Sequence, residues 1–321
     1  MVYQTESAAK KPSGRAIKLK RTLLKAIRCW QLYVLLLIPV VYTVIFAYVP
    51  MYGAQIAFRN FRPVAGIWGS EFVGLEHFIK FAKSVSFWQL IRNTIVISVY
   101  DLVLSLPFSM LFALGLNYIR QKGYKKTIQL ISYAPHFIST VVMCGIIVQF
   151  VNPRIGIINK LFEAVGMAKV DFLASPNAFP SLYVWTNLWQ SLGFSSIIFI
   201  AVLSSVNPEL HEAAIVDGAT ITKRIIFIDL PAIMPTAITL LILNSGKILS
   251  LGFEKVLLLQ TPLNQRTSEV ISTYIYKIGI AANFPNFSYS TAVGLFQSII
   301  GLLLMIGVNT VSRKVSETSL W

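Results

Sequence analysis

The sequence has few charged residues for its length. Only 13% of its 321 residues are charged, about half the share of a typical soluble domain, whereas 55% are hydrophobic and the mean hydropathy is +0.66. This composition excludes intrinsic disorder, which requires low hydrophobicity. It also argues against a soluble enzyme, because one core of this size cannot bury so much apolar surface. The composition therefore indicates an integral membrane protein.

Cysteine and histidine are too scarce and too scattered for a metal or redox site. The two cysteines, Cys29 and Cys144, lie in a basic tail and an apolar run, so neither a disulfide nor a Cys-x-x-Cys site is expected. The three histidines, His77, His136 and His211, form no zinc-binding motif. The sequence also contains no phosphate-binding loop, no dinucleotide-binding glycine motif and no nucleophile elbow. We therefore predict a protein that is not an enzyme, with no metal and no cofactor of its own.

Six apolar runs are each long enough to cross a bilayer as a helix, which takes about 20 residues. They cover residues 30–49, 94–118, 127–153, 172–208, 232–253 and 278–312, the fourth being densely apolar from 179 and the sixth over 291–310. The first run is too long and starts too late for a cleaved signal peptide. The predicted fold class is an all-α integral membrane protein with six transmembrane helices.

The net charge of +15 comes mainly from bases near the ends of these runs. Lys and Arg residues close to span ends mark the cytoplasmic side. With six spans, sixteen of the 28 bases lie on one side: Lys10, Lys11, Arg15, Lys18, Lys20, Arg21, Lys25, Arg28, Arg120, Lys122, Lys125, Lys126, Lys223, Arg224, Arg313 and Lys314. This bias predicts both termini in the cytoplasm and contact with membrane lipid, and no nucleic-acid partner.

The chain is predicted to contain a basic cytoplasmic tail over residues 1–29 and a six-span membrane domain over 30–321. Within the tail, residues 17–28 alternate basic and apolar side chains at helical spacing. This pattern favours an amphipathic helix lying at the membrane interface, and the alternative is a solvated basic tail.

The loop over residues 207–231 contains a short acidic helix where a simple connection between two spans would suffice. Asn207 is a good N-cap, Pro208 suits the first helical position, and Glu209 and Glu212 favour a helix N-terminus. Gly218 suits a left-handed stop after the helix. A capped helix with small side chains is suited to docking in the groove of a partner, and the alternative is a helix lying on the membrane surface.

The same loop resembles a known signature. Glu212-Ala213-Ala214 is followed by Gly218 and then, nine residues later, by Ile228 and the pair Leu230-Pro231. This spacing resembles the EAA loop of ABC importer permeases, and every fixed position is present. The chain is similar, through all six spans, to the sugar and oligosaccharide permeases of this group. A narrower resemblance is to permeases for oligosaccharides derived from complex polysaccharides, through 253–256, 273–276 and 292–297.

The resemblance implies a type I ABC importer permease in the cytoplasmic (inner) membrane of a prokaryote. It implies a second permease as a heterodimer partner, two ATPase subunits that bind ATP and Mg²⁺, and an extracytoplasmic solute-binding protein. The EAA helix of such permeases docks on the ATPase. Carried over by position, the coupling residues are Glu212, Ala213, Ala214, Asp217, Gly218, Leu230 and Pro231, of which Asp217 is a flanking candidate only.

Polar side chains inside apolar runs are costly and are often functional. The candidates for the substrate pathway are Trp185, Asn187, Trp189, Gln190, Asn244, Lys247 and Gln297. Trp185 and Trp189 share a helix face and suit stacking on sugar rings, with an interfacial aromatic belt as the alternative. Asp101 is expected to be paired within the bundle, and His136 to be a structural partner at a kink.

Lys247, together with a surplus of bases over acids on the outer side, suits an anionic sugar such as a uronate oligomer. The rival hypotheses are an ABC permease for another solute, such as an amino acid or a polyamine, and an ion-coupled secondary transporter. The second rival is disfavoured because only Asp101 is an evident intramembrane acid.

Overall fold

The computed structural model describes residues 28–316 of the chain. The chain divides into two compact units, Met1–Gln55 and Ile56–Trp321, and each is described by itself. The interfacial helix predicted over 17–28 and nearly all of the basic tail lie outside the described residues. The boundary predicted between residues 29 and 30 stays a prediction.

The first unit contains one long apolar helical run. It comprises α2 (Trp30–Thr43), the π-helical segment η1 (Val44–Tyr48), α3 (Val49–Met51) and the start of the 3-10 segment η2 (Tyr52–Phe58). Pro39 lies inside α2, and the carbonyl of Pro39 accepts a hydrogen bond of 2.7 Å from the Thr43 hydroxyl. None of the residues of α2, η1 and α3 is buried within the protein, and so apolar a helix suits contact with lipid.

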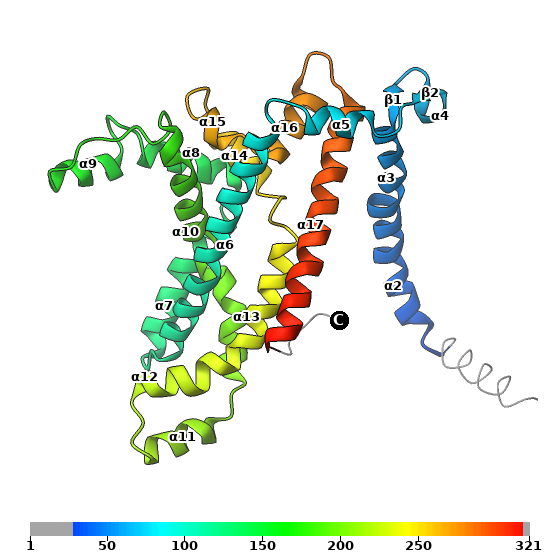
Figure 1. Ribbon diagram of the computed structural model, residues 1–321. Helices are drawn as coiled ribbons and strands as arrows, with labels where there is room; N and C mark the ends of the chain where they lie inside the picture. The colour runs from blue at the N-terminus through cyan, green and yellow to red at the C-terminus, as the bar shows by residue number, and fades with distance from the viewer. Residues whose placement is uncertain (1–27, 317–321) are drawn as a thin grey trace, which may run out of the picture. The chain divides into compact units, whose positions relative to one another are not determined.

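Four long helices form the frame of the second unit (Figure 1). They are α6 (Phe87–Asn117), α10 (Phe179–Ser204), the continuous run of α12 (Ile221–Arg224), η5 (Ile225–Asp229) and α13 (Leu230–Ser245), and α17 (Phe287–Ser316). With the first unit, five helices of the described chain are long and apolar enough to cross a membrane. Helices α6 and α12–α13 begin several residues before the apolar runs that were predicted at 94 and 232. Apolar composition marks only the part of a helix that lies in hydrocarbon, and these helices continue beyond it.

The third predicted span is broken. Instead of one helix over 127–153, α7 (Lys122–Tyr133) and the 3-10 turn η3 (Ala134–Phe137) meet α8 (Thr140–Phe150) at 105°. Pro135 lacks a backbone N–H, so it cannot continue the hydrogen bonding of α7. Ser139 caps the next helix by accepting a hydrogen bond from Val142 N, so α8 begins after the bend. The prediction of six spans therefore holds only if this bent pair counts as one.

The structure also corrects the predicted position of three basic residues. Lys122, Lys125 and Lys126, which the sequence assigned to a loop, belong to α7.

The remaining elements are short. They are β1 (Arg59–Arg62), α4 (Gly66–Gly69), β2 (Ser70–Phe72), α5 (Glu76–Ala82), α9 (Ile157–Ala164), η4 (Pro176–Ala178), α11 (Pro208–Val216), α14 (Phe253–Leu259), α15 (Gln265–Ser268), α16 (Ile271–Tyr276) and η6 (Lys277–Ala281). Strands β1 and β2 pair antiparallel, a small exception to the predicted all-helical fold. In the second unit, α11 lies at one end of the long helices, and α5 and α14–α16 lie at the other (Figure 1).

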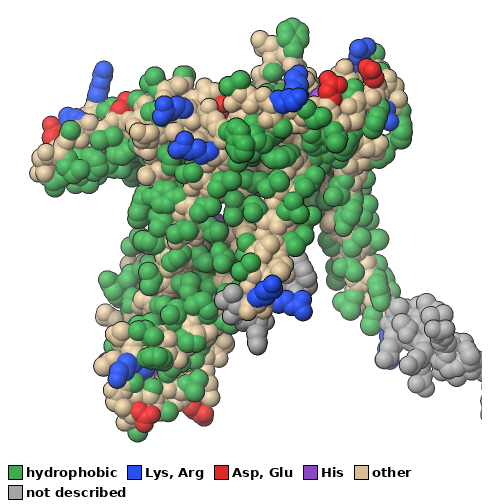
Figure 2. Space-filling model, in the orientation of Figure 1, with side chains coloured by type: hydrophobic (Ala, Val, Ile, Leu, Met, Phe, Trp, Pro, Cys, Tyr) green, Lys and Arg blue, Asp and Glu red, His purple; other side chains and the backbone are tan. Residues whose placement is uncertain are grey.

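Hydrophobic side chains cover the middle of the long helices, and charged side chains gather toward their ends (Figure 2). Three apolar clusters hold the second unit together. One is centred on α8, α10 and α14, one on α5, α16 and α17, and one on α6, α10 and α13. Helix α6 contributes to all three, through Ile97, Leu90 and the pair Ala113 and Leu114, and α10 contributes to two of them.

A glycine allows α10 to approach α7 closely. Gly193 is buried, and a Cβ atom added there would collide with the backbone carbonyl of Ser132 on α7. A backbone carbonyl cannot move aside as a flexible side chain can. The close packing of α10 on the first half of the broken span therefore requires glycine at this position.

We expect Gly193→Ala to destabilise the protein by about 1–3 kcal/mol through overpacking. Gly115→Ala is the matched control, because Gly115 also lies inside a long helix but a Cβ there meets nothing within 4 Å. Thermal unfolding of the purified protein in detergent measures the difference. Equal melting temperatures for the two variants would show that the close approach is not required.

Candidate functional site

Helix α11 is capped at both ends by its own sequence. The Asn207 side chain accepts a hydrogen bond of 3.1 Å from Glu209 N, as predicted from its N-cap position. At the other end Gly218 has φ +73°, and its N–H donates to Ile215 O at 3.0 Å while Ala219 N donates to Ala214 O at 2.8 Å. These two bonds form a Schellman motif, which needs a left-handed residue at this position. The predicted short helix and its glycine stop are confirmed.

The two sides of α11 differ in exposure. His211 and Ala214 are half-buried, whereas its other residues are exposed. Given 100° per residue, the face opposite to them presents Glu209, Glu212, Ala213 and Val216. Of the predicted coupling residues, Glu212 and Ala213 are therefore available to a partner, and Ala214 faces inward.

The other predicted coupling residues lie beside or beyond α11. Asp217 and Gly218 are exposed at its C-terminal end. Leu230 and Pro231 begin α13 inside a continuous helix, and Leu230 packs against the apolar cluster of α6, α10 and α13. The Leu-Pro pair of the motif thus lies at the start of α13, within one of the long helices.

A polar cavity lies among α6, α10, α14 and the segment 245–252 that follows α13. Two adjoining hollows, of about 360 and 760 Å³, share the lining residues Tyr183, Asn187, Ser191 and Gly252. We call the pair the central cavity. Four of the predicted pathway residues line it: Asn187, Gln190, Asn244 and Lys247.

Asp101 and Asn187 form a polar pair in the central cavity. Asn187 Nδ2 donates to Asp101 Oδ1 at 2.9 Å, between α10 and α6. Asp101 is therefore held within the bundle, as predicted, and it also lines the cavity.

Lys255 is a cavity residue that sequence reasoning did not single out. It is only 4% exposed, its Nζ lies 3.5 Å from Gln190 Oε1, and it lies 5.6 Å from the centre of the Tyr183 ring. Burial lowers the pKa of Lys255 to about 8 from its ordinary 10.5. The available signal was a lysine directly before the apolar stretch 256–259.

The other predicted pathway residues lie elsewhere. Trp185 and Trp189 line an apolar hollow of about 290 Å³ with Ile147 and Phe150, on another face of α10 from Asn187. Gln297 is buried and donates to Leu249 O at 2.6 Å, so it holds the segment that lines the central cavity.

His136 lies in the bend of the broken span, as its expected role as a kink partner requires. Its ring stacks on Phe194 with the ring centres 3.9 Å apart. It also lines the larger hollow of the central cavity.

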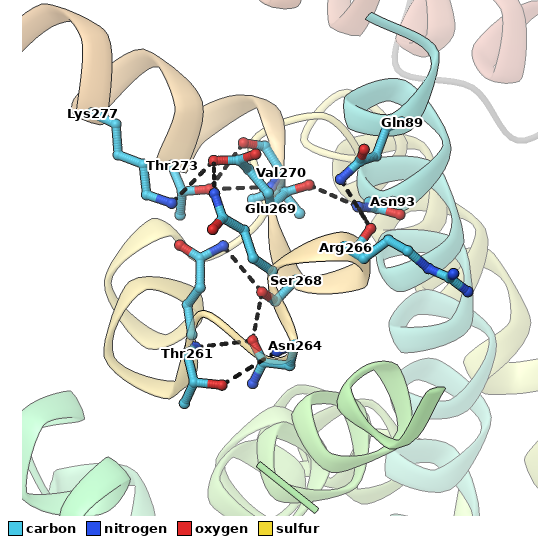
Figure 3. Close-up of polar contacts among 12 residues, drawn as sticks. Gln89, Asn93, Thr261, Asn264, Arg266, Ser268, Glu269, Val270, Thr273 and Lys277 are labelled. Carbon is cyan, nitrogen blue, oxygen red and sulfur yellow. Dashed lines mark hydrogen bonds and ion pairs between the residues drawn. The ribbon is translucent and has the colours of Figure 1, made fainter. Parts of the chain in front are cut away.

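A polar network fixes the segment that joins α14 to α16 (Figure 3). Asn264 is fully buried; its Oδ1 accepts from Thr261 N and Ser268 Oγ, and its Nδ2 donates to Leu173 O and Leu259 O. Asn93 of α6 donates to the carbonyls of Arg266 and Glu269. A buried amide with all these bonds satisfied is rigid. The network therefore anchors α14, which carries Lys255, to the long helices.

Comparison with known proteins identifies the family to which this chain belongs. Residues 92–317 match the family described as "Binding-protein-dependent transport system inner membrane component". Two relatives come from Bacillus subtilis (strain 168), and each is 39% identical. Protein LplB aligns over 290 residues, covering 90% of this chain and 91% of its own. The polygalacturonan/rhamnogalacturonan transport system permease protein YteP aligns over 304 residues, covering 95% and 94%.

Two solved structures share the fold. One is a bacterial ABC transporter involved in the import of the acidic polysaccharide alginate, with a TM-score of 0.83 and 38% identity over 92% of this chain and 99% of that chain. The other is a bacterial alginate ABC transporter in complex with an alginate pentasaccharide-bound periplasmic protein, with a TM-score of 0.84 and 37% identity over 94% and 100%. The predicted resemblance and fold class are confirmed. The chain belongs to the family of inner membrane components of binding-protein-dependent transport systems, and it is a translocation subunit embedded in that membrane.

Proposed function

We propose that the chain is the permease subunit of an ABC importer that moves an acidic oligosaccharide across the inner membrane. Among its relatives are a polygalacturonan/rhamnogalacturonan permease and alginate transporters, all of which handle acidic polysaccharides or their fragments. The proposed partners are a second permease, two ATPase subunits that bind ATP and Mg²⁺, and a binding protein that delivers the substrate. A complex with a substrate-loaded periplasmic protein in one similar structure supports the last of these.

The observation that supports an acidic substrate is the pair of lysines in the central cavity. Among residues 28–316, neither Lys247 nor Lys255 forms an ion pair with a carboxylate. The lining also contains two acids: Asp101 accepts a hydrogen bond from Asn187 and attracts Lys255 from beyond ion-pair distance, and Glu254 is exposed. Lys255 is buried, whereas Lys247 is exposed. A buried ammonium group without an ion-paired carboxylate is costly, and a carboxylate of the substrate would offset that cost at Lys255.

The remaining cavity groups suit the neutral part of a sugar. Gln190, Asn187 and Asn244 offer amide groups that bond hydroxyls, and Tyr183 adds an aromatic ring and a hydroxyl. The same lysines disfavour a polyamine, which is itself cationic.

In the proposed orientation, the end that carries α11 and both termini lie in the cytoplasm. The exposed face of Glu209, Glu212, Ala213 and Val216 then docks on the ATPase. Closure of the ATPase moves α11 and shifts the long helices between outward-open and inward-open states. The chain itself performs no covalent chemistry in this cycle.

Replacing either cavity lysine is expected to weaken transport of an acidic substrate selectively. Lys255→Met or Lys247→Met should reduce substrate-stimulated ATPase activity toward a uronate oligomer about tenfold or more, because a charge-assisted hydrogen bond contributes about 1.5–3 kcal/mol. A neutral oligosaccharide that also stimulates the native complex is the comparison substrate. The measurement uses the complex reconstituted with its binding protein. Equal losses for both substrates would refute charge recognition by these lysines.

The pKa of about 8 predicts a pH dependence. Lys255 is protonated at pH 7, and its charge is lost as the pH rises through 8. Stimulation by a uronate oligomer should therefore fall between pH 7 and 9. Lys255→Arg should retain stimulation over this range, because a guanidinium stays protonated. If the arginine variant and the native protein lose activity in parallel, the titrating group is elsewhere, for example in the binding protein.

The coupling face is tested by reversing one charge. Glu212→Lys should leave the folded permease intact, reduce co-purification of the ATPase and lower the transport achieved per ATP hydrolysed. Glu71→Lys is the control, since Glu71 is an exposed acid on β2 at the end of the unit away from α11. Native levels of ATPase capture and transport in Glu212→Lys would contradict the proposed docking face.

A further inference from the structure

A buried carboxylate joins three elements at the end of the unit that carries α11. Asp229 is fully buried at the end of the π-helical segment η5, just before α13. Its Oδ2 accepts a hydrogen bond of 2.6 Å from the hydroxyl of Tyr118, at the end of α6. Its Oδ1 lies 3.3 Å from Nε2 of His211 on α11. One side chain thus touches the short helix and the bases of two long helices.

The contact with His211 is close but is not an aligned hydrogen bond. Asp229 Oδ1 has no well-aligned hydrogen-bond donor although His211 lies within ion-pair distance. Arg224 adds a second base to the cluster, with its guanidinium carbon 5.6 Å from the centre of the Tyr118 ring and its Nε buried without an acceptor. Packed apolar side chains would be at least as stable as such a partly satisfied group. Stability alone therefore does not explain an acid at this position.

Helix α11 is otherwise placed loosely. None of its residues is buried, and of its two half-buried side chains only His211 is polar. The side of α11 that carries His211 is opposite to the face of Glu209, Glu212, Ala213 and Val216. The helix therefore has one face toward the proposed partner and one polar contact toward the long helices.

We propose that the His211–Asp229–Tyr118 contact is the mechanical link through which movement of α11 reaches α6 and α13 together. The inference rests on the proposed coupling role of α11. Asp229 acts as the positioning residue, because each of its oxygens contacts a different element: Oδ2 accepts a hydrogen bond from Tyr118, and Oδ1 lies 3.3 Å from His211. Movement of α11 is transmitted through His211 to Asp229, directly before α13. The hydrogen bond from Tyr118 to Asp229 then moves the end of α6 in the same direction. π-helical segments often occur at functional sites, and Asp229 ends one.

The link is tested by separating ATP hydrolysis from transport in the reconstituted complex. Asp229→Asn, which keeps the shape of the side chain, and His211→Gln should each retain ATPase co-purification and thermal stability near native levels. Both should lower the transport achieved per ATP hydrolysed at least about fivefold, within the range of ordinary coupling energies. The double variant should be no worse than the worse single variant, because both changes break one contact. Glu163→Gln, an exposed acid on α9, is the control.

A distance measurement on the otherwise native chain provides an independent readout. Spin labels at Ile215 and Phe227, which are 55% and 74% exposed, report on α11 and on the base of the α12–α13 helix. Their separation should stay constant between the nucleotide-free and ATP-bound complexes, and should differ between these states once Asp229→Asn is introduced. A separation that changes in the native protein, additive effects in the double variant, or an unchanged transport-to-ATP ratio would each overturn the link. Failure of the proposed function is distinguishable, since a native chain would then neither bind an ATPase nor transport.

Discussion

The scarcity of water within a membrane is the constraint on which this structure depends. Backbone groups in hydrocarbon must be paired within the protein, so the spanning segments are helical and the few polar side chains must find partners inside the bundle. Asn187 binds Asp101 between α10 and α6, and Tyr118 binds Asp229 between α6 and η5. The same constraint makes the burial of Lys255 without an ion-paired carboxylate costly.

The two polar regions of the second unit share helices. Helix α6 carries Asp101 in the central cavity and ends next to Tyr118, which contacts Asp229. The α12–α13 helix carries Asp229 and ends just before Lys247. Two continuous helices thus connect the region near α11 with the cavity.

The segment that joins α14 to α16 fixes one wall of the cavity. Asn264 and Asn93 bind backbone carbonyls and so hold the segment between α14 and α16 against α6. Because α14 carries Lys255, this network sets where the ammonium group lies. Flexible polar groups would lose binding energy to ordering, whereas anchored groups avoid most of that loss.

The sequence by itself determined the class of protein, the approximate spans and the short capped helix with its glycine stop, because these depend on composition and on local backbone preferences. It also indicated the family, through the spacing from Glu212 to Pro231. Only the tertiary structure decided which polar residues meet: that Asn187 faces Asp101 while Trp185 lies on another face, that Lys255 enters the cavity, and that His211 reaches Asp229. A kink beside His136 was expected, but a bend of 105° that divides the span was not, since apolar composition continues through it. Contacts between residues far apart in the chain depend on how helices pack and rotate, which local patterns do not encode.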